Sequence, residues 1–325
     1  MKVLIADKFA DTGIEALGGL GCDVDCNPEL KGDALTQAVR DSNCQVLIVR
    51  STKVERATLE AGESLKLIIR AGSGFDTIDF EGAAELDIRV CNCPGMNSVA
   101  VAELTIGLMV ALDRRIVDET VDLRRGVWNK KEYSKARGLK GRTLGVVGLG
   151  RIGYEVAKRA KAFDMNLIYC DVVVQSKAEE ELGIKKVAFE QVLSDADFIS
   201  LHVPGGEGTR HVIGRDELKR MKPTAFLFNC SRGGVVDQEA LAEALRDGVI
   251  AGAGLDVYEI EPAATDKEFK DPVVQAPRLY GTHHVGASTE QAQDAVAEEV
   301  VRIVQTFKTS GEFLHCVNPA APAAT

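Results

Sequence analysis

Short runs of Val, Ile and Leu recur along the whole chain and alternate with segments whose apolar residues are spaced as in a helix. The runs predict strands at Val3–Ala6, Val46–Val49, Leu67–Ile69, Ile88–Cys91, Leu144–Val147, Leu167–Cys170, Phe198–Leu201, Ala225–Phe228 and Gly252–Leu255. Most runs lack polar alternation, which is typical of strands buried on both faces of a parallel sheet. Helical segments such as Gly153–Phe163 and Gln238–Arg246 would form the crossovers. The pattern predicts an α/β fold.

Open doubly wound sheets are favoured over a closed barrel, because the series of strands is interrupted. A barrel needs one continuous series of strand–helix units. Here a long predicted helix, Ser98 to about Arg115, and a basic, irregular stretch up to Arg142 divide the chain. We predict one sheet in residues 1–96 and a second in residues 143–287. The spacing also predicts a helix at Thr289–Phe307, which could pack on either domain.

The composition is that of a globular protein. With 325 residues, the chain is long enough for about two domains of roughly 150 residues each. Hydrophobic residues make up 45% and charged residues 27%, which excludes a disordered or collagen-like chain. The net charge of −10 means that the chain lacks the overall positive charge typical of nucleic-acid-binding proteins, so no nucleic-acid partner is expected.

No segment is predicted to enter a membrane. The most apolar helical segment, Val99–Leu112, contains Glu103 and is shorter than the ~20 residues that a bilayer requires. The N-terminal apolar run is too brief for a signal peptide. Eight scattered cysteines favour reduced thiols and a cytoplasmic protein. Cys91 and Cys93 lack a second ligand pair, so no metal site is expected.

A glycine-rich turn follows the strand Leu144–Val147 and opens a helix. Gly148 permits a tight turn, Gly150 lets the backbone approach a pyrophosphate, and Gly153 allows close packing of helix on strand. The N-terminus of the helix offers free N–H groups to the phosphates. About 20 residues on, Asp171 ends the next strand, where a carboxylate accepts hydrogen bonds from a ribose diol and repels a 2′-phosphate. The motif predicts NAD rather than NADP; the alternative is a structural turn.

Three later segments place polar side chains after predicted strands. Arg232 follows Ala225–Phe228, Glu261 follows Gly252–Leu255, and His284 comes after them. A histidine, a carboxylate and an arginine at strand ends form an acid/base set with a group that polarises a carbonyl. Taken singly, each has a structural alternative: an ion-pair partner, a solvated loop residue or an interior histidine.

Cations also follow two strands of the N-terminal sheet, at Arg50, Lys53 and Arg70. Convergent cations with hydroxyl or backbone donors are what a substrate phosphate needs. Such donors would come from Ser51, Thr52 and Gly72. The alternative is a set of solvated surface charges. A second basic stretch, either a solvated linker or a further part of the anionic site, contains Arg124, Arg125, Lys130, Lys131, Lys135, Arg137, Lys140 and Arg142.

Taken together, these motifs resemble a known family. Segments Gly148–Gly153, Asn229–Asp237, Leu255–Pro262 and His284–Ser288 have the order and spacing of the D-isomer-specific 2-hydroxyacid dehydrogenases. The N-terminal segments resemble the phosphoglycerate dehydrogenase branch, and they are Val49–Lys53, Arg70–Asp76, Pro94–Ser98 and Ala102–Thr105. The resemblance covers about residues 2–318.

The resemblance implies a fold, a cofactor and a reaction. A Rossmann domain for NAD, residues 97–287 with a dimerisation helix, would be inserted into a flavodoxin-like substrate domain of residues 1–96 and 288–325. The chain would form a homodimer around Ser98–Arg115. It would oxidise 3-phospho-D-glycerate to 3-phosphohydroxypyruvate, the first step of serine biosynthesis. Alternatives are a glyoxylate or hydroxypyruvate reductase, and an NAD-sensing protein-interaction scaffold.

The resemblance also implies residue roles. His284 would be the general acid/base, Glu261 its carboxylate partner, and Arg232 the group that binds the substrate carboxylate. The NAD site would comprise Ser73, Gly148, Gly150, Arg151, Ile152, Gly153, Asp171, Val203, Cys230, Ser231, Arg232, Asp256, His284, Gly286 and Ala287. The substrate site would comprise Arg50, Ser51, Lys53, Arg70, Gly72, Asn97, Arg232 and His284.

Two features depart from the family pattern. The residue before the catalytic histidine is commonly proline, and here it is His283. We interpret it as a turn substitution, with a second titrating ring as the alternative. The chain also ends soon after Asn318, so we expect no serine-binding regulatory domain.

Overall fold

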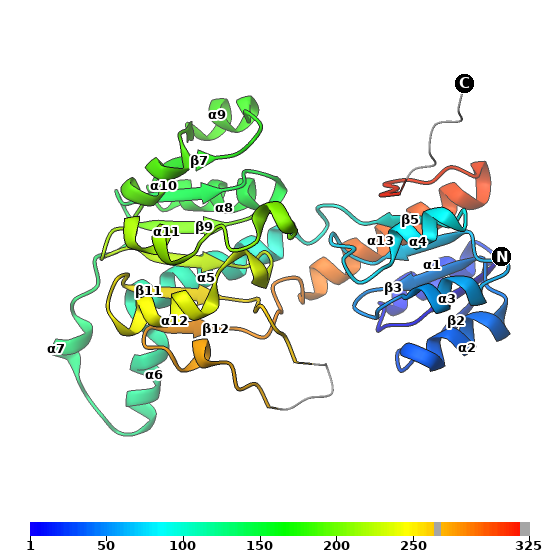
Figure 1. The fold of residues 1–325 in the computed structure, drawn as a ribbon, viewed down its shortest axis with the longest axis horizontal. Helices are drawn as coiled ribbons and strands as arrows, with labels where there is room; N and C mark the ends of the chain where they lie inside the picture. The colour runs from blue at the N-terminus through cyan, green and yellow to red at the C-terminus, as the bar shows by residue number, and fades with distance from the viewer. Residues whose placement is uncertain (263–267, 319–325) are drawn as a thin grey trace. The chain divides into compact units, whose positions relative to one another are not determined.

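The computed structural model describes residues 1–262 and 268–318, and the chain divides into two compact α/β units (Figure 1). The first unit comprises Met1–Asn97 and Ser288–Thr325, and the second comprises Ser98–Ala287. Each unit is built on its own parallel sheet, so the predicted fold class is confirmed.

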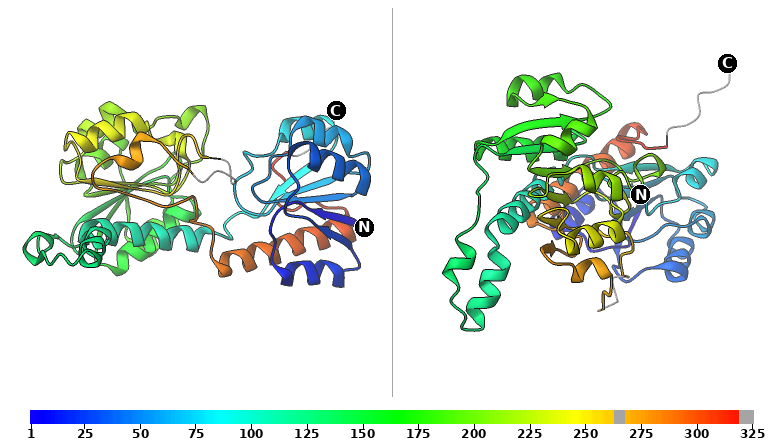
Figure 2. Two further views of the ribbon diagram at one scale, coloured as in Figure 1. Left: turned by 90° about the horizontal axis from the view of Figure 1, so that it is seen from below. Right: turned by 60° about the vertical axis from the view of Figure 1, so that its left-hand side comes forward.

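The sheet of the first unit has five parallel strands in the order β2-β1-β3-β4-β5, the order of flavodoxin-like folds. Its strands are β1 Lys2–Ile5, β2 Asp23–Cys26, β3 Val46–Val49, β4 Leu67–Arg70 and β5 Arg89–Asn92. Its helices are α1 Asp11–Gly19, α2 Gly32–Ser42, α3 Arg56–Ala61, α4 Phe80–Glu85 and α13 Glu290–Ser310. Helices α1 and α13 cover one face of the sheet and α2, α3 and α4 the other (Figure 2).

The sheet of the second unit has seven parallel strands in the order β8-β7-β6-β9-β10-β11-β12. Its strands are β6 Thr143–Val147, β7 Asn166–Cys170, β8 Lys185–Lys186, β9 Phe198–Leu201, β10 Phe226–Asn229, β11 Gly252–Leu255 and β12 Leu279–Gly281. The strand order reverses at β6, which is the point where Rossmann sheets bind dinucleotides.

Helices cover both faces of this second sheet. They are α5 Ser98–Arg114, α6 Ile116–Arg124, α7 Lys130–Tyr133, α8 Arg151–Ala162, α9 Ser176–Leu182, α10 Phe189–Asp195, α11 Arg215–Arg220 and α12 Gln238–Arg246, with 3₁₀ turns at Glu207–Thr209, Gly233–Val235 and Pro272–Gln275. One apolar cluster joins α5, α8 and α9 to the sheet, and a second joins α10, α11 and α12 to the other face.

The apolar pattern missed three strands: β2, β8 and β12. All lie at sheet edges, where a strand can be short and polar because only one side pairs. The sequence Asp-Val-Asp-Cys of β2 and the Lys-Lys pair of β8 are therefore compatible with strand structure. The stretch after α5, predicted as irregular, contains the helices α6 and α7.

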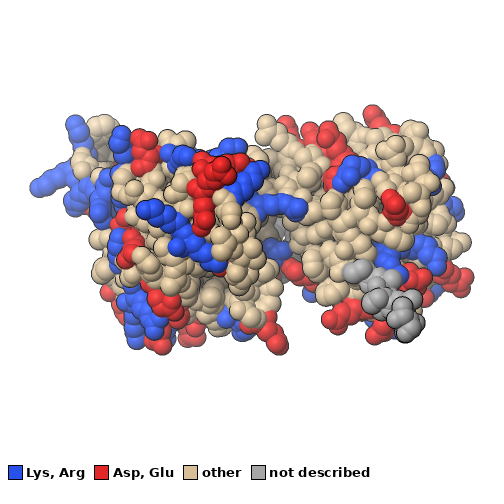
Figure 3. All heavy atoms as spheres, turned by 90° about the horizontal axis from the view of Figure 1, so that it is seen from above, with Lys and Arg blue, Asp and Glu red and all other residues tan. Residues whose placement is uncertain are grey.

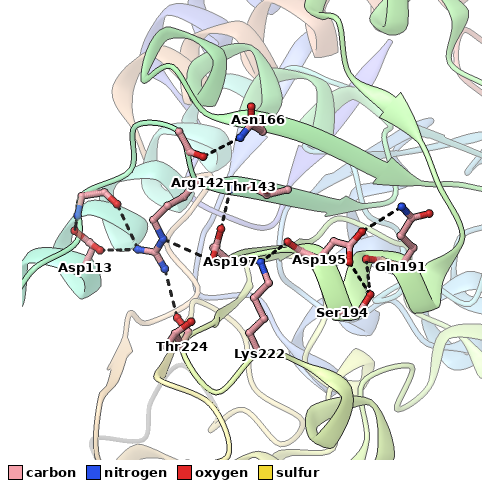
Figure 4. Close-up of polar contacts among 12 residues, drawn as sticks. Asp113, Arg142, Thr143, Asn166, Gln191, Ser194, Asp195, Asp197, Lys222 and Thr224 are labelled. Atoms are coloured by element: carbon pink, nitrogen blue, oxygen red, sulfur yellow. Dashed lines mark hydrogen bonds and ion pairs between the residues drawn. The ribbon is translucent and has the colours of Figure 1, made fainter.

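The basic stretch 124–142 is not one solvated patch, because Arg142 is buried. Figure 4 shows its guanidinium donating to Asp113 at 2.8 Å and lying 3.9 Å from a carboxylate oxygen of Asp197. Its charge also lies over the ring of Phe198, 4.2 Å from the centroid. This network is at the amino ends of β6, β9 and β10, the edge opposite the glycine turn, and thus has a structural role. Lys140, by contrast, is an exposed partner of Asp164.

Acidic and basic side chains are interspersed on the face of the molecule that Figure 3 shows. In the described ranges 1–262 and 268–318, the structure contains no helix of sufficient length and apolarity to cross a membrane.

Candidate active site

The glycine turn between β6 and α8 has the geometry of a phosphate-binding loop. Gly148 has a φ of +86°, and a Cβ there would lie 2.8 Å from the carbonyl oxygen of His202. A Cβ on Gly153 would lie 2.3 Å from the carbonyl oxygen of Gly148, so helix and turn approach closely. A Cβ on Gly150 would meet no atom within 4 Å. The turn thus leaves open space at the N-terminus of α8, where an anion is stabilised.

Asp171 lies directly after β7 and is tied to this turn. Its Oδ2 accepts a hydrogen bond from the N–H of Leu149 at 2.7 Å, and its Oδ1 accepts one from Val173 at 3.0 Å. Each carboxylate oxygen has a second lone pair, so acceptor capacity remains for a ribose diol. Residues 172–176, Val-Val-Val-Gln-Ser, carry no positive charge that would neutralise a 2′-phosphate.

The other residues predicted to bind the cofactor differ in burial and in their contacts. Val203 lies against the glycine turn, 3.0 Å from where a Cβ of Gly148 would be. Cys230 is buried, and burial raises its thiol pKa to about 12. The hydroxyl of Ser231 donates to Asn229 at 2.8 Å. Arg151 is exposed and Ile152 is half-buried at the start of α8.

His284 and Glu261 form a direct pair in the second unit. Nδ1 of His284 lies 2.8 Å from Oε2 of Glu261, and the other carboxylate oxygen accepts the N–H of Tyr258 at 3.2 Å. The hydrogen bond to Glu261 raises the pKa of His284 and outweighs the effect of burial. Burial alone would raise the pKa of Glu261, but the hydrogen bond to His284 and the charges nearby lower it. The pair therefore favours an imidazolium beside a carboxylate.

The backbone at His284 is held in an uncommon conformation by Asp256. His284 has a φ of +53°, and its N–H donates to the carbonyl of Asp256 at 2.8 Å. The buried carboxylate of Asp256 accepts the N–H groups of Val285 at 2.9 Å and Gly286 at 2.8 Å, and the hydroxyl of Thr282 at 2.6 Å. Asp256 thus fixes the turn that carries the histidine. The family resemblance places Asp256 only at the NAD site and does not include Thr282.

Arg232 comes from the turn after β10, which is organised by Asn229. The side-chain oxygen of Asn229 accepts from Ser231, and its nitrogen donates to the carbonyl of Arg232 at 2.9 Å. The guanidinium of Arg232 donates to the carbonyl of Ser231 at 2.8 Å. Its positive charge acts to lower the pKa of both His284 and Glu261. The predicted acid, carboxylate and cation therefore lie together in one unit.

In the first unit, Asp7 occupies the donors that follow β3. Its Oδ2 accepts the N–H groups of Arg50 at 2.6 Å, Ser51 at 3.1 Å and Thr52 at 3.0 Å, and its Oδ1 accepts the hydroxyl of Ser51 at 2.9 Å. Sequence analysis offered Ser51 and Thr52 as phosphate donors, and it did not foresee this carboxylate. At this strand end, the hypothesis of a phosphate site therefore depends on the side chains of Arg50 and Lys53.

Arg70 and Gly72 lie at the end of the neighbouring strand β4. Arg70 is in register with Val49, the residue before Arg50, so the two arginines come from adjacent strand ends. The guanidinium of Arg70 packs against Gly72, since a Cβ there would overlap its Nη1. Beside them, the hydroxyl of Ser73 donates to the side chain of Asn97 at 2.7 Å. Ser73, predicted for the NAD site, and Asn97, predicted for the substrate, are thus direct partners.

The arrangement suits proton and hydride transfer. Across residues 1–262 and 268–318, no group of three or more His, Cys, Asp or Glu side chains is placed to hold a metal ion. The second unit combines an open phosphate turn with an acid/base pair and an arginine, all at the carboxyl ends of its strands. These are the parts that a nicotinamide-dependent oxidoreductase needs.

Comparisons with known proteins agree with this geometry. The model of the D-isomer specific 2-hydroxyacid dehydrogenase NAD-binding domain matches residues 106–286. A D-3-phosphoglycerate dehydrogenase of Methanocaldococcus jannaschii is 43% identical over 94% of this chain and 58% of its own length. A glyoxylate reductase of Thermococcus litoralis is 45% identical over 84% of this chain and 82% of its own length. The crystal structure of a glyoxylate reductase from Paecilomyes thermophila superposes with a TM-score of 0.86 at 30% identity, covering 98% of both chains. This chain therefore spans little more than half the length of the phosphoglycerate dehydrogenase that it matches.

Proposed function

Since the chain belongs to the D-isomer-specific 2-hydroxyacid dehydrogenases, we propose that it oxidises 3-phospho-D-glycerate to 3-phosphohydroxypyruvate with NAD, the entry step of serine biosynthesis. The observation that carries the dehydrogenase chemistry is the 2.8 Å pair of His284 and Glu261 beside Arg232. The observation that favours a phosphorylated substrate is the pair of cations, Arg50 and Lys53, after β3. We assign the cofactor to the second unit and the phosphate to the first.

The acid/base step follows from the pair geometry. Nδ1 of His284 is engaged with Glu261, so Nε2 is the atom that exchanges the proton with substrate. In oxidation, neutral His284 accepts the proton of the 2-hydroxyl at Nε2 while the hydride leaves C2. Glu261 stabilises the imidazolium that forms, and Arg232 stabilises the negative charge that develops on the oxygen. In reduction, the imidazolium returns this proton.

The residues of the second unit fit the dinucleotide. NAD supplies the acceptor for the hydride. The turn of Gly148, Gly150 and Gly153 would receive its pyrophosphate at the N-terminus of α8, in the open space beside Gly150 and next to Arg151 and Ile152. Asp171 would bind the adenosine ribose and select NAD over NADP. The remainder would be lined by Val203, Cys230, Ser231, Asp256, Gly286 and Ala287.

A second candidate function is the reduction of glyoxylate or hydroxypyruvate. It is favoured by the 45% identity to a protein named glyoxylate reductase, of which this chain covers 82%. It would leave the side chains of Arg50 and Lys53 as surface charges beside the segment in which Asp7 accepts the N–H groups of Arg50, Ser51 and Thr52. An NAD-sensing scaffold remains the alternative outside enzymes, and it predicts binding of NAD with negligible turnover.

One substrate panel separates these functions. NADH oxidation is measured with phosphohydroxypyruvate, hydroxypyruvate, glyoxylate and pyruvate at matched concentrations. We expect the highest kcat/KM with phosphohydroxypyruvate. A higher value with glyoxylate or hydroxypyruvate contradicts the phosphoglycerate assignment, and no turnover with any of the four contradicts the enzyme.

We further propose a homodimer formed through apolar side chains of α5 and of the segment that follows it. These side chains are unusually exposed for their type: Val99, Ile116, Val117, Val121, Leu123, Val127 and Trp128. Trp128 alone is 80% exposed. Exposed apolar patches of this kind mark interaction surfaces. Light scattering of the full chain tests the dimer, and a monomer at micromolar concentration contradicts it.

A further inference from the structure

Two cysteines of the first unit lie directly opposite each other across a short antiparallel pairing. Cys91 is in the middle of β5, and Cys316 is in the segment that follows α13. The N–H of Val317 donates to the carbonyl of Val90 at 2.8 Å, and the N–H of Asn92 donates to the carbonyl of His315 at 3.3 Å. These two bonds flank the cysteines, so the cysteines form a non-hydrogen-bonded pair.

That position brings the two thiols within bonding range. In non-hydrogen-bonded antiparallel pairs the Cα atoms are about 4.5 Å apart and the side chains lie on the same face. Disulfides span Cα separations of about 4.4–6.8 Å. Cys91 is fully buried and Cys316 packs, half-buried, against the same apolar cluster under α13. A bond between them therefore needs side-chain rotation rather than backbone movement.

The segment that carries Cys316 is held in register by Asn318. The side-chain oxygen of Asn318 accepts the N–H of Val90 at 2.7 Å, and its nitrogen donates to the carbonyls of Phe80 and Ile88, both at 3.0 Å. Asn318 is 6% exposed, so these bonds are shielded from water. The pairing of Cys91 with Cys316 is thus fixed on both sides of the cysteines.

The two thiols differ in reactivity. Burial raises the pKa of Cys91, and the interaction with Cys316, including a hydrogen bond between the two thiols, raises it further. Cys316 is half-buried, and its thiol lies 3.5 Å from the side-chain oxygen of Asn318. Cys316 is therefore the sulfur that an oxidant in solution reaches first. Cys91 remains a protonated thiol next to it.

We propose that Cys91 and Cys316 form a redox modification site, closed to a disulfide by hydrogen peroxide and reopened by a dithiol. The Cys316 thiolate attacks one peroxide oxygen and becomes a sulfenic acid as the O–O bond breaks and hydroxide leaves. The Cys91 sulfur then loses its proton, attacks the Cys316 sulfur and expels hydroxide, which leaves as water. Two thiols and one peroxide give one disulfide and two waters.

Cys93 is the competing partner, and geometry disfavours it. It lies two residues further along the chain, directly after β5, so in extended backbone its Cα is about 6.6 Å from that of Cys91, near the upper limit for a disulfide. Its thiol lies 3.9 Å from the carbonyl of Val296 on α13. Burial raises its pKa to about 12. Cys93 is therefore expected to remain a thiol.

The disulfide would have a topological effect. Both connections between the units, at residues 97–98 and 287–288, lie between Cys91 and Cys316 in the sequence. The bond would close a ring that contains the entire second unit and would tie the two chain segments of the first unit together. Because it constrains a long loop of the unfolded chain, it would raise the stability of the first unit.

The test uses the full chain and needs no enzyme assay. The reduced protein is treated with a small excess of hydrogen peroxide, quenched and analysed by intact mass, non-reducing gel and peptide mapping. We expect a loss of two hydrogens, faster gel migration because the denatured chain contains a large ring, and one linked peptide that joins Cys91 to Cys316. Dithiothreitol should reverse all three.

Matched variants identify the pair. Cys316→Ser and Cys91→Ala should abolish the linked species, whereas Cys93→Ser and Cys22→Ser, a change at another half-buried cysteine of the same unit, should retain it. Circular dichroism verifies that each variant is folded. The proposal is overturned if wild type gains oxygen without losing two hydrogens, if the linked peptide contains other cysteines, or if folded Cys316→Ser forms the same species.

Discussion

Nδ1 of His284 and Oε2 of Glu261 lie 2.8 Å apart, and this contact sets which proton His284 can move. Glu261 engages Nδ1 rather than Nε2, and it raises the pKa of the ring. The protonated form, which the proposed role of His284 in reduction requires, therefore persists to higher pH than it would for an isolated imidazole.

Removing the carboxylate charge should shift the pH dependence of the reaction. In wild type, kcat/KM for reduction falls as pH rises through the raised pKa of His284, while kcat/KM for oxidation rises. Glu261→Gln removes the partner of the imidazolium, so the alkaline limb of reduction should move to lower pH. pH profiles in both directions measure this. Superimposable profiles for the two proteins would show that Glu261 does not tune His284.

The two adjacent histidines should differ sharply in importance. His284→Ala should lower turnover by roughly 10²–10⁴-fold, the range for loss of a general acid/base. His283 is exposed, and His283→Ala should change turnover little. Steady-state kinetics of both variants, with NADH binding measured separately, test the assignment. The reverse ranking would move the proton-transfer role to His283.

Asp171 should determine the choice between NADH and NADPH. Its carboxylate would repel the 2′-phosphate, and residues 172–176 have no cation to offset this. Wild type should therefore prefer NADH, and Asp171→Ala should narrow the preference, mainly by weakening NADH binding. The ratio of kcat/KM for the two cofactors measures it. Equal efficiency in wild type would contradict the role of Asp171.

Arg50 should bind the phosphate of the substrate and so favour phosphorylated over unphosphorylated substrates. A charge-assisted contact is worth about 1.5–3 kcal/mol, or roughly 10–150-fold in binding. Arg50→Ala should therefore raise KM for phosphohydroxypyruvate and barely affect kinetics with hydroxypyruvate. Arg70→Ala should act likewise, with a larger structural cost because Arg70 packs on Gly72. The ratio of kcat/KM for the two substrates is decisive, and Arg56→Ala, at an exposed ion pair of the same unit, is the control. If the ratio does not change, the substrate assignment returns to the broader 2-hydroxyacid class.

The buried Arg142 should be a stability determinant. Arg142→Met leaves Asp113 and Asp197 without their shared cation, and breaking a buried ion pair costs about 3–5 kcal/mol. Lys140→Met breaks an exposed pair with Asp164, for which about 0–1 kcal/mol is expected. Denaturant unfolding of both variants measures the difference. Similar losses would mean that burial of Arg142 does not set its contribution.

Sequence patterns predicted the central strands because burial on both faces leaves a continuous apolar signature. The strand β3 at Val46–Val49 and the strand β9 at Phe198–Leu201 begin and end where the apolar runs do. The edge strands β2, β8 and β12 carry no such signature, and β8 consists of two lysines. Their position depends on pairing with one neighbour, which local sequence does not encode.

The candidate site was predictable where a role depends on residue type and spacing, and not where it depends on a long-range contact. The spacing of Gly148, Gly150 and Gly153 predicts a phosphate-binding turn from the sequence alone. The hydrogen bonds from Val285 and Gly286 to Asp256 join residues about thirty positions apart in the sequence. The hydrogen bond from Ser51 to Asp7 joins residues more than forty positions apart. No local sequence pattern predicts which backbone N–H groups either carboxylate accepts. The residue roles themselves stay predictions until the variants above are measured.

The division of the first unit into two chain segments has a consequence for synthesis. Helix α13 packs against α1, where Gly13 lies close to Ala297, yet α1 is synthesised before the whole second unit and α13 after it. The second unit is continuous and can fold while the chain is still on the ribosome. The sheet of the first unit cannot bury the face that α13 covers until the second unit and α13 itself have been synthesised. During that interval, Val3, Ile5 and Ile48, which are buried in the finished protein, are exposed to chaperones and to other nascent chains.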